Sequence, residues 1–238
     1  MFAVTFAVFV AVAVAVAVAV AVMTAAVVVA ASSLPPLSLY VHLPWCIKKC
    51  PYCDFNSHEW RSGASADLPE QRYLDALCAD LEHSLPLIWG RAVHSIFIGG
   101  GTPSLFSPQA IGRLISDLRA RLNLEADCEI TLEANPDSVT AEKLARYLEV
   151  GFNRISFGMQ STSTHVLKVL DRTHDPENVK RAVDMARAAG FGSVSVDLIY
   201  GTPGESLKDW QSTVTQALNL GVDHISAYAL IIEEGTKL

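Results

Sequence analysis

Residues 1–41 contain no Asp, Glu, Lys, Arg or His, and the first cation of the chain is Lys48. A secretory signal peptide begins with a positively charged region, so this absence argues against secretion. Residues 11–22 alternate strictly between Ala and Val, which makes them a low-complexity tract. Two interpretations stay open. Residues 1–33 form either a repeat-derived Ala/Val extension, which we favour, or a stretch that associates with a membrane, because residues 1–31 are long enough to span a bilayer.

The chain also lacks an excess of basic residues. It has 18 Lys and Arg against 25 Asp and Glu among its 238 residues, and a formal net charge of −7. Proteins that bind nucleic acid usually carry a basic patch, so we expect no nucleic-acid partner. Hydrophobic residues make up 50% of the sequence, which is enough for one sizeable core. The five cysteines are too few and too clustered for a disulfide framework, and they favour a cytoplasmic protein.

Three of the cysteines, Cys46, Cys50 and Cys53, follow the spacing C-x3-C-x2-C. A [4Fe–4S] cluster has four irons, and cluster proteins normally supply a thiolate to each of them. Three thiolates leave one iron open to an exchangeable ligand, for which S-adenosylmethionine (SAM) is the obvious candidate through its amino and carboxylate groups. The alternative is structural zinc, but zinc takes four ligands. The only nearby candidates for a fourth ligand are His42 and His58, so the spacing favours the cluster.

Beyond residue 36 the sequence alternates between short β-branched runs and amphipathic helical patterns. Strands are expected at 39–43, 95–98, 129–133, 154–157, 194–199 and 224–228. Helix-start signals stand between them, at Ser107, Thr140, Asp175 and Ser206. Repeated β–α units imply an α/β fold with a parallel sheet, and six strands are too few for an eightfold barrel. In such barrels chemistry sits at the carboxyl ends of the strands, and the cysteines follow the first strand.

Several polar and glycine residues stand at the ends of the predicted strands. The run GGGTP (99–103) follows the second strand, where glycines let the backbone approach a ligand closely. Glu133 and Asp197 close the third and fifth strands, where a carboxylate can accept hydrogen bonds from ribose hydroxyls or from an ammonium group. A helix N-cap is an equally good interpretation of each. Gln160 and Arg172 follow the fourth strand, and a solvated surface charge is the simpler interpretation of Arg172 alone.

Six stretches of sequence occur in a fixed order: YVHLPWC (40–46), CPYCDFNSH (50–58), IFIGGGTPS (96–104), EANP (133–136), NRISFGMQS (153–161) and DLIYGTPG (197–204). Together they resemble the oxygen-independent coproporphyrinogen III oxidase family of radical SAM proteins. The resemblance implies a partial (β/α)6 radical SAM barrel over residues 34–238, with the cluster held by Cys46, Cys50 and Cys53. It also implies a set of SAM contacts, namely Tyr40, Tyr52, Gly100, Gly101, Thr102, Glu133, Gln160, Arg172, Asp197, Ile199 and Ala229.

Within this family, coproporphyrinogen dehydrogenases carry a further cysteine two residues after the third cluster cysteine. This sequence has Phe55 at that position. Its stretch CPYCDFNSH (50–58) resembles the HemW branch, whose members are regarded as haem chaperones. That branch implies haem or porphyrin as partner, haem-acceptor proteins, an electron donor for the cluster and a homodimer.

The alternative function is that of the dehydrogenase, in which a radical generated from SAM starts the decarboxylation of two propionates to vinyl groups. Family members are longer than this sequence. The haem-binding region is expected in the C-terminal portion that the sequence lacks.

Overall fold

The computed structural model describes residues 34–60, 67–88 and 90–238. Six strands of these residues form one sheet in the order β1-β4-β5-β6-β7-β8, and every neighbouring pair is parallel. Their bounds are β1 Leu37–Leu43, β4 Ala92–Gly100, β5 Asn123–Ala134, β6 Arg154–Gln160, β7 Ser193–Tyr200 and β8 His224–Ala229. β1 and β8 are the two edges of the sheet, so the barrel is open. The six predicted strands and the partial barrel are confirmed.

The expected extension at residues 1–33 lies outside the described residues. Within the part of the chain that the structure describes, no helix combines the length and the apolar character needed to cross a membrane.

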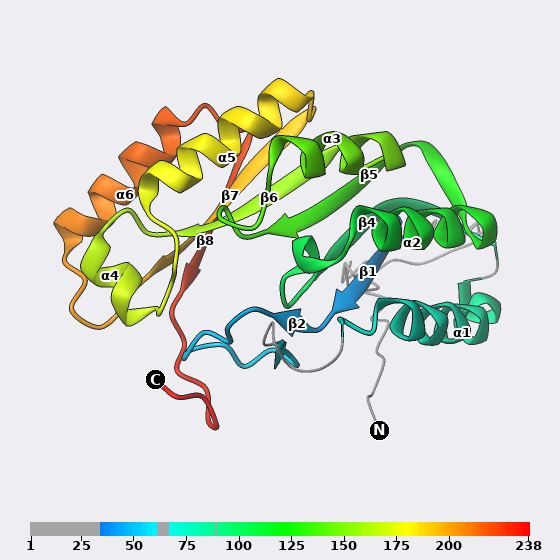
Figure 1. Cartoon of the computed structure of the whole chain (residues 1–238), viewed down its shortest axis with the longest axis horizontal. Helices are drawn as coiled ribbons and strands as arrows, with labels where there is room; N and C mark the ends of the chain where they lie inside the picture. The colour runs from blue at the N-terminus through cyan, green and yellow to red at the C-terminus, as the bar shows by residue number, and fades with distance from the viewer. Residues whose placement is uncertain (1–33, 61–66, 89) are drawn as a thin grey trace, which may run out of the picture.

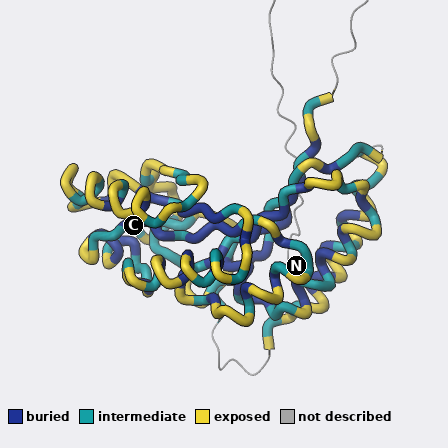
Figure 2. The backbone as a smooth tube through the Cα atoms, turned by 90° about the horizontal axis from the view of Figure 1, so that it is seen from above, coloured by how far each residue is buried: buried dark blue, intermediate teal, exposed yellow. Residues whose placement is uncertain are grey.

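Helices connect the strands. The longer ones are α1 Glu70–Ile88, α2 Pro108–Arg121, α3 Ala141–Val150, α5 Pro176–Ala189 and α6 Leu207–Asn219. Crossovers between parallel strands share one hand, so strands in sequential order place their helices on one face of the sheet. Figure 1 shows α3, α5 and α6 along this face. Figure 2 shows the buried stretches of backbone in the strands and the exposed ones on the outer turns of the helices.

The predicted helix starts are present. Ser107, Thr140, Asp175 and Ser206 each accept a hydrogen bond from the backbone N–H three residues further on, at 2.7–3.2 Å. Such a cap satisfies a backbone donor that the first turn leaves without a partner, and stabilises the helix by about 1 kcal/mol. The sequence patterns missed four short elements. They are the 3-10 helix η1 (Pro103–Leu105), helix α4 (Thr164–Val169) and the paired strands β2 (Trp45–Cys46) and β3 (His58–Glu59).

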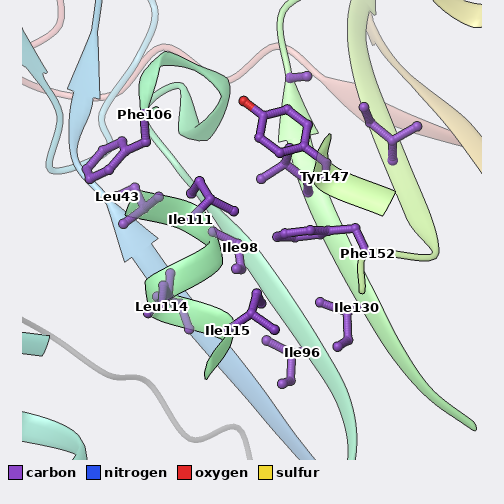
Figure 3. Packing of buried hydrophobic residues seen from close by; sticks show 14 of the residues in the cluster. Leu43, Ile96, Ile98, Phe106, Ile111, Leu114, Ile115, Ile130, Tyr147 and Phe152 are labelled. Atoms are coloured by element: carbon purple, nitrogen blue, oxygen red, sulfur yellow. The ribbon is translucent and has the colours of Figure 1, made fainter. Parts of the chain in front are cut away.

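The main hydrophobic core lies between the sheet and its helices. Figure 3 shows Ile111 and Ile115 of α2 in one cluster with Ile98 of β4, and all three are at most 2% exposed. Fully burying a side chain of this size contributes about 1.5–3 kcal/mol. The core therefore fixes the strands, and the loops at their carboxyl ends are held on a rigid frame.

Candidate functional site

A cavity of about 410 Å³ opens at the carboxyl ends of the strands. Thirteen of the fourteen predicted site residues line it, namely Cys46, Cys50, Tyr52, Cys53, Gly100, Gly101, Thr102, Glu133, Gln160, Arg172, Asp197, Ile199 and Ala229. They come from the cysteine loop, from the ends of β4 to β8 and from the loop after α4. The parallel sheet thus brings together groups that are far apart in the sequence.

Tyr40 is the one predicted residue that the structure does not bring to the cavity wall. It lies on β1, where its ring stacks on Phe97 with 6.1 Å between the ring centroids. Its hydroxyl is hydrogen-bonded to Nδ1 of His42 at 3.2 Å, and His42 Nε2 donates to the carbonyl oxygen of Asn56 at 2.8 Å. Tyr40 therefore supports His42 and the start of the cysteine loop.

The three cluster cysteines are free, half-buried and face the same cavity. Burial raises the pKa of the Cys46 thiol, while hydrogen bonds to Thr102 and Ser57 act in the opposite direction. Sγ of Cys53 lies 3.7 Å from the hydroxyl oxygen of Ser57. Neither His42 nor His58 lines this cavity, so the wall offers three sulfurs and no histidine. Three sulfurs without a fourth match three corners of a [4Fe–4S] cube.

No group of three or more His, Cys, Asp or Glu side chains within residues 34–60, 67–88 and 90–238 has the arrangement of a site for one metal ion.

The glycine run at the end of β4 leaves no room for side chains. A Cβ atom at Gly99 would lie 2.6 Å from Oε2 of Glu133, and one at Gly101 would lie 2.6 Å from the carbonyl oxygen of Trp45. Gly100 has φ +112° and would bring a Cβ within 2.5 Å of the His42 ring. The Gly101 N–H also donates to the carbonyl oxygen of Leu43 at 2.8 Å. The run therefore packs closely on the cysteine loop and presents bare backbone to the cavity, as a cradle for a small charged ligand requires.

Two carboxyl groups stand in the cavity wall at the ends of β5 and β7. Burial, and then the negative charge of Asp197, raise the pKa of Glu133 to about 7, although its carboxylate accepts a hydrogen bond from the N–H of Gly100 at 3.2 Å. Burial also raises the pKa of Asp197, which accepts a hydrogen bond from the hydroxyl of Ser156 at 2.9 Å. Two poorly solvated carboxylates favour a ligand that carries positive charge and hydroxyl groups. SAM has both, in its ammonium, its sulfonium and its ribose.

Arg172 reaches the cavity from the loop after α4. Its Nη2 donates to Oδ1 of Asn135 at 2.5 Å and to the carbonyl oxygen of Gly158 at 3.2 Å, and its Nη1 donates to Sγ of Cys50 at 3.5 Å. The interpretation of Arg172 as a solvated surface charge is therefore wrong.

Gln160 at the end of β6 has φ +61°, in the left-handed region that a residue with a Cβ rarely adopts. It follows a register shift between Gly158 and Gln160. Such backbone strain clusters at functional sites.

The sequence interpretation missed other residues of the wall, among them Asn135, Ser156 and Leu230. Asn135 donates to the hydroxyl of Thr102 at 3.4 Å and accepts from Arg172, so it joins the glycine run to the arginine. It follows Glu133 closely at the end of β5, and that position was the available signal.

The second missed feature is α4. Its Val166, with Leu170 and Ile199, forms a small apolar cluster on which Tyr52 packs. This cluster holds the aromatic ring of the cysteine loop against the sheet.

The segment after β8 returns to the cysteine loop. The N–H groups of Lys237 and Leu238 both donate to the carbonyl oxygen of Pro51, at 2.8 and 3.1 Å. Ile231 and Glu233 of the same segment line the cavity. One side of the site is therefore built from the last residues of the chain.

Comparison with known families gives the same picture. Residues 40–217 match the family described as the radical SAM superfamily. The chain belongs to the radical SAM superfamily. Membership implies a [4Fe–4S] cluster and SAM, and the cavity offers the groups that such a pair needs: three thiols, a bare glycine backbone and two carboxyl groups.

Individual relatives indicate which branch of the superfamily the chain resembles. It is 47% identical over 203 residues to the heme chaperone HemW of Escherichia coli (strain K12), across 85% of this chain and 53% of that protein. It is 43% identical over 205 residues to HemW of Mycobacterium tuberculosis (strain ATCC 25618 / H37Rv), across 85% and 52%. The chain thus spans about half the length of the curated relatives it matches. These relatives support the predicted HemN/HemW-like family.

Solved structures agree. The coproporphyrinogen III oxidase HemN from Escherichia coli superposes with a TM-score of 0.72 at 33% identity, across 81% of this chain and 43% of that one. Methylornithine synthase (PylB) superposes with a TM-score of 0.59 at 15% identity, across 84% and 55%, which shows the shared fold alone.

Proposed function

We propose that this chain binds a [4Fe–4S] cluster and SAM in the cavity, and that it belongs to a HemW-type haem chaperone that passes haem to acceptor proteins. The observation that carries the proposal is Phe55, at the position where the dehydrogenases of the family carry a further cysteine. Phe55 lines the cavity and is 57% exposed, so a bulky apolar ring stands there in place of a thiol. The identity to proteins named as heme chaperones supports it.

The cysteines Cys46, Cys50 and Cys53 hold the cluster in this proposal, and the open iron takes the amino-acid end of SAM. When bound together, the two groups supply one-electron chemistry at the sulfonium. The glycine backbone at 100–101 accommodates the charged end of SAM, because both residues line the cavity and have no side chain that would fill it. Glu133 and Asp197 take its ammonium and ribose hydroxyls.

The remaining predicted contacts complete the SAM pocket. Tyr52 and Ile199 give apolar surface, and the pair is fixed by the packing of α4. Thr102, Gln160, Arg172 and Ala229 line the rest of the wall, and in this proposal their polar groups or backbone contact the ligand. Tyr40 acts indirectly, through its hydrogen bond to His42 beside the glycine run.

Coproporphyrinogen dehydrogenation is the second candidate function, because the HemN structure is 33% identical with a TM-score of 0.72. If the chain has this second function, its partner is coproporphyrinogen and not haem. An electron donor for the cluster, haem-acceptor proteins and a homodimer belong to the proposal in its chaperone form.

One anaerobic experiment separates the two functions. The chain, reconstituted with iron and sulfide, is titrated with haem while the Soret band is followed. It is also incubated with coproporphyrinogen III, SAM and a reductant, with the Escherichia coli oxidase as the positive control. The proposal predicts no protoporphyrinogen from the chain, and stoichiometric haem binding once the chain is joined to the remaining portion of the Escherichia coli heme chaperone, of which it matches 53%. Formation of protoporphyrinogen at a rate comparable with the control would overturn it, and so would a joined protein that holds the cluster but binds no haem.

A further inference from the structure

Four consecutive residues after α4 each bond to a different part of the site. Asp171, which has φ +53°, forms an ion pair with Lys48 of the cysteine loop at 2.6 Å. Thr173 donates its hydroxyl to a carboxylate oxygen of Asp137, and His174 Nε2 donates to the carbonyl oxygen of Met159 at 2.9 Å. We call residues 171–174 the strap. It joins the cysteine loop, the loop after β5 and the end of β6, and Arg172 lies within it.

The strap aims one guanidinium N–H at a single cluster cysteine. Arg172 Nη1 donates to Sγ of Cys50 at 3.5 Å, while its Nη2 is held by Asn135 and by the carbonyl oxygen of Gly158. The other two sulfurs have neutral partners. Cys53 pairs with the hydroxyl of Ser57, and Cys46 has the hydroxyls of Thr102 and Ser57. The polar surroundings of the three sulfurs are therefore unequal, and Cys50 carries the charged bond.

The reduction potential of an iron–sulfur cluster depends on the hydrogen bonds to its sulfurs, its net charge and its exposure to solvent. A charged donor stabilises the form that carries more negative charge on sulfur, which is the reduced cluster. We propose that Arg172 raises the reduction potential of the cluster through its hydrogen bond to Cys50, and that His174 positions Arg172 for this role. The inference rests on the proposed function and assigns Arg172 a task separate from contact with SAM.

The test is a potentiometric titration of the reconstituted cluster, followed by EPR without SAM, with iron counted in every sample. Arg172→Met is compared with Arg146→Met, which removes the same charge from an exposed ion pair on α3. At a fixed potential, R172M should lower the ratio of reduced to oxidised cluster about tenfold, a shift of about 59 mV to more negative potential. R146M should change that ratio less than twofold.

Two further variants separate tuning from structural damage. Arg172→Lys keeps the charge without the planar fork, so its potential should fall between those of the wild type and R172M. His174→Ala should shift the potential in the same direction as R172M. His174→Gln, which retains an N–H donor for Met159, should restore it. A residue with a purely structural role would change the iron content and leave the potential of the loaded fraction unchanged.

The outcomes are distinct. Wild type and R172M that both hold four irons and differ less than twofold overturn the inference and leave the proposed function intact. If R172M loses the cluster, R172K carries the test, and a potential equal to that of the wild type overturns the inference. A wild-type chain that takes up no four-iron cluster overturns the proposed function itself.

Discussion

Replacing Glu133 with Gln should stabilise the ligand-free fold at alkaline pH. The ordinary pKa of this carboxyl is 4.5, and burial together with Asp197 raises it to about 7 in the fold. Between these values the folded chain keeps a proton that the unfolded chain has lost, so stability falls as pH rises from about 4.5 to about 7. A difference of about 2.5 units, at 1.36 kcal/mol each, destabilises the fold by about 3 kcal/mol above pH 7.

Gln at this position has the same shape and no charge to bury, and its oxygen can still accept the hydrogen bond from the N–H of Gly100. We therefore expect E133Q to raise the free energy of unfolding by about 3 kcal/mol at pH 8, and by less than about 1 kcal/mol at pH 5. Urea unfolding of the ligand-free chain, followed by circular dichroism, measures both values.

Glu149→Gln is the matched control, because Glu149 is exposed on α3 and its ion pair with Arg146 contributes less than about 1 kcal/mol at any pH. The same E133Q variant should lose affinity for SAM. A gain in stability that is equal at pH 5 and pH 8, or a loss at pH 8, would refute the reasoning.

Three further substitutions test other parts of the account. Gly100→Ala should lower the free energy of unfolding by about 1–3 kcal/mol in urea, because φ is +112° and the new Cβ would meet the His42 ring; an unchanged midpoint contradicts this. Asn153→Ala should cost about 1–3 kcal/mol in the same assay, since its amide satisfies two backbone groups of β5, yet leave SAM binding measured by calorimetry intact. Lys48→Met should lower the free energy of unfolding by less than about 1 kcal/mol, because the ion pair of Lys48 with Asp171 is exposed. A larger decrease would show that this ion pair stabilises the fold.

The fold could be predicted from the sequence because its signals are local. The strand at 194–199 is rich in Val and Ile and lies within β7, and Thr140 and Asp175 cap the N-termini of α3 and α5 as predicted. The helix α4 could not be found in this way. It spans six residues, and its stability comes from packing against Ile199 and Tyr52 rather than from any periodic pattern.

Part of the candidate site could be predicted in the same way, because the glycine run, Glu133 and Asp197 stand at the ends of parallel strands, which meet at one edge of the sheet. Contacts such as Ile199 and Ala229 were implied only by the family resemblance. The electrostatics of the site could not be predicted. The raised pKa of Glu133 depends on Asp197, which lies two strands away, and on burial that no single segment reveals. The ion pair between Lys48 and Asp171 joins residues 123 positions apart. Contacts of this kind form only when the sheet is assembled, so the sequence of either segment alone does not predict them.

The central claim is that three cysteines hold a four-iron cluster whose open iron binds SAM. Anaerobic reconstitution with iron counting, and EPR of the reduced protein with and without SAM, tests it most directly. We expect four irons per chain and a signal that changes when SAM is added. Zinc in place of iron, or a four-iron signal that SAM leaves unchanged, would contradict it.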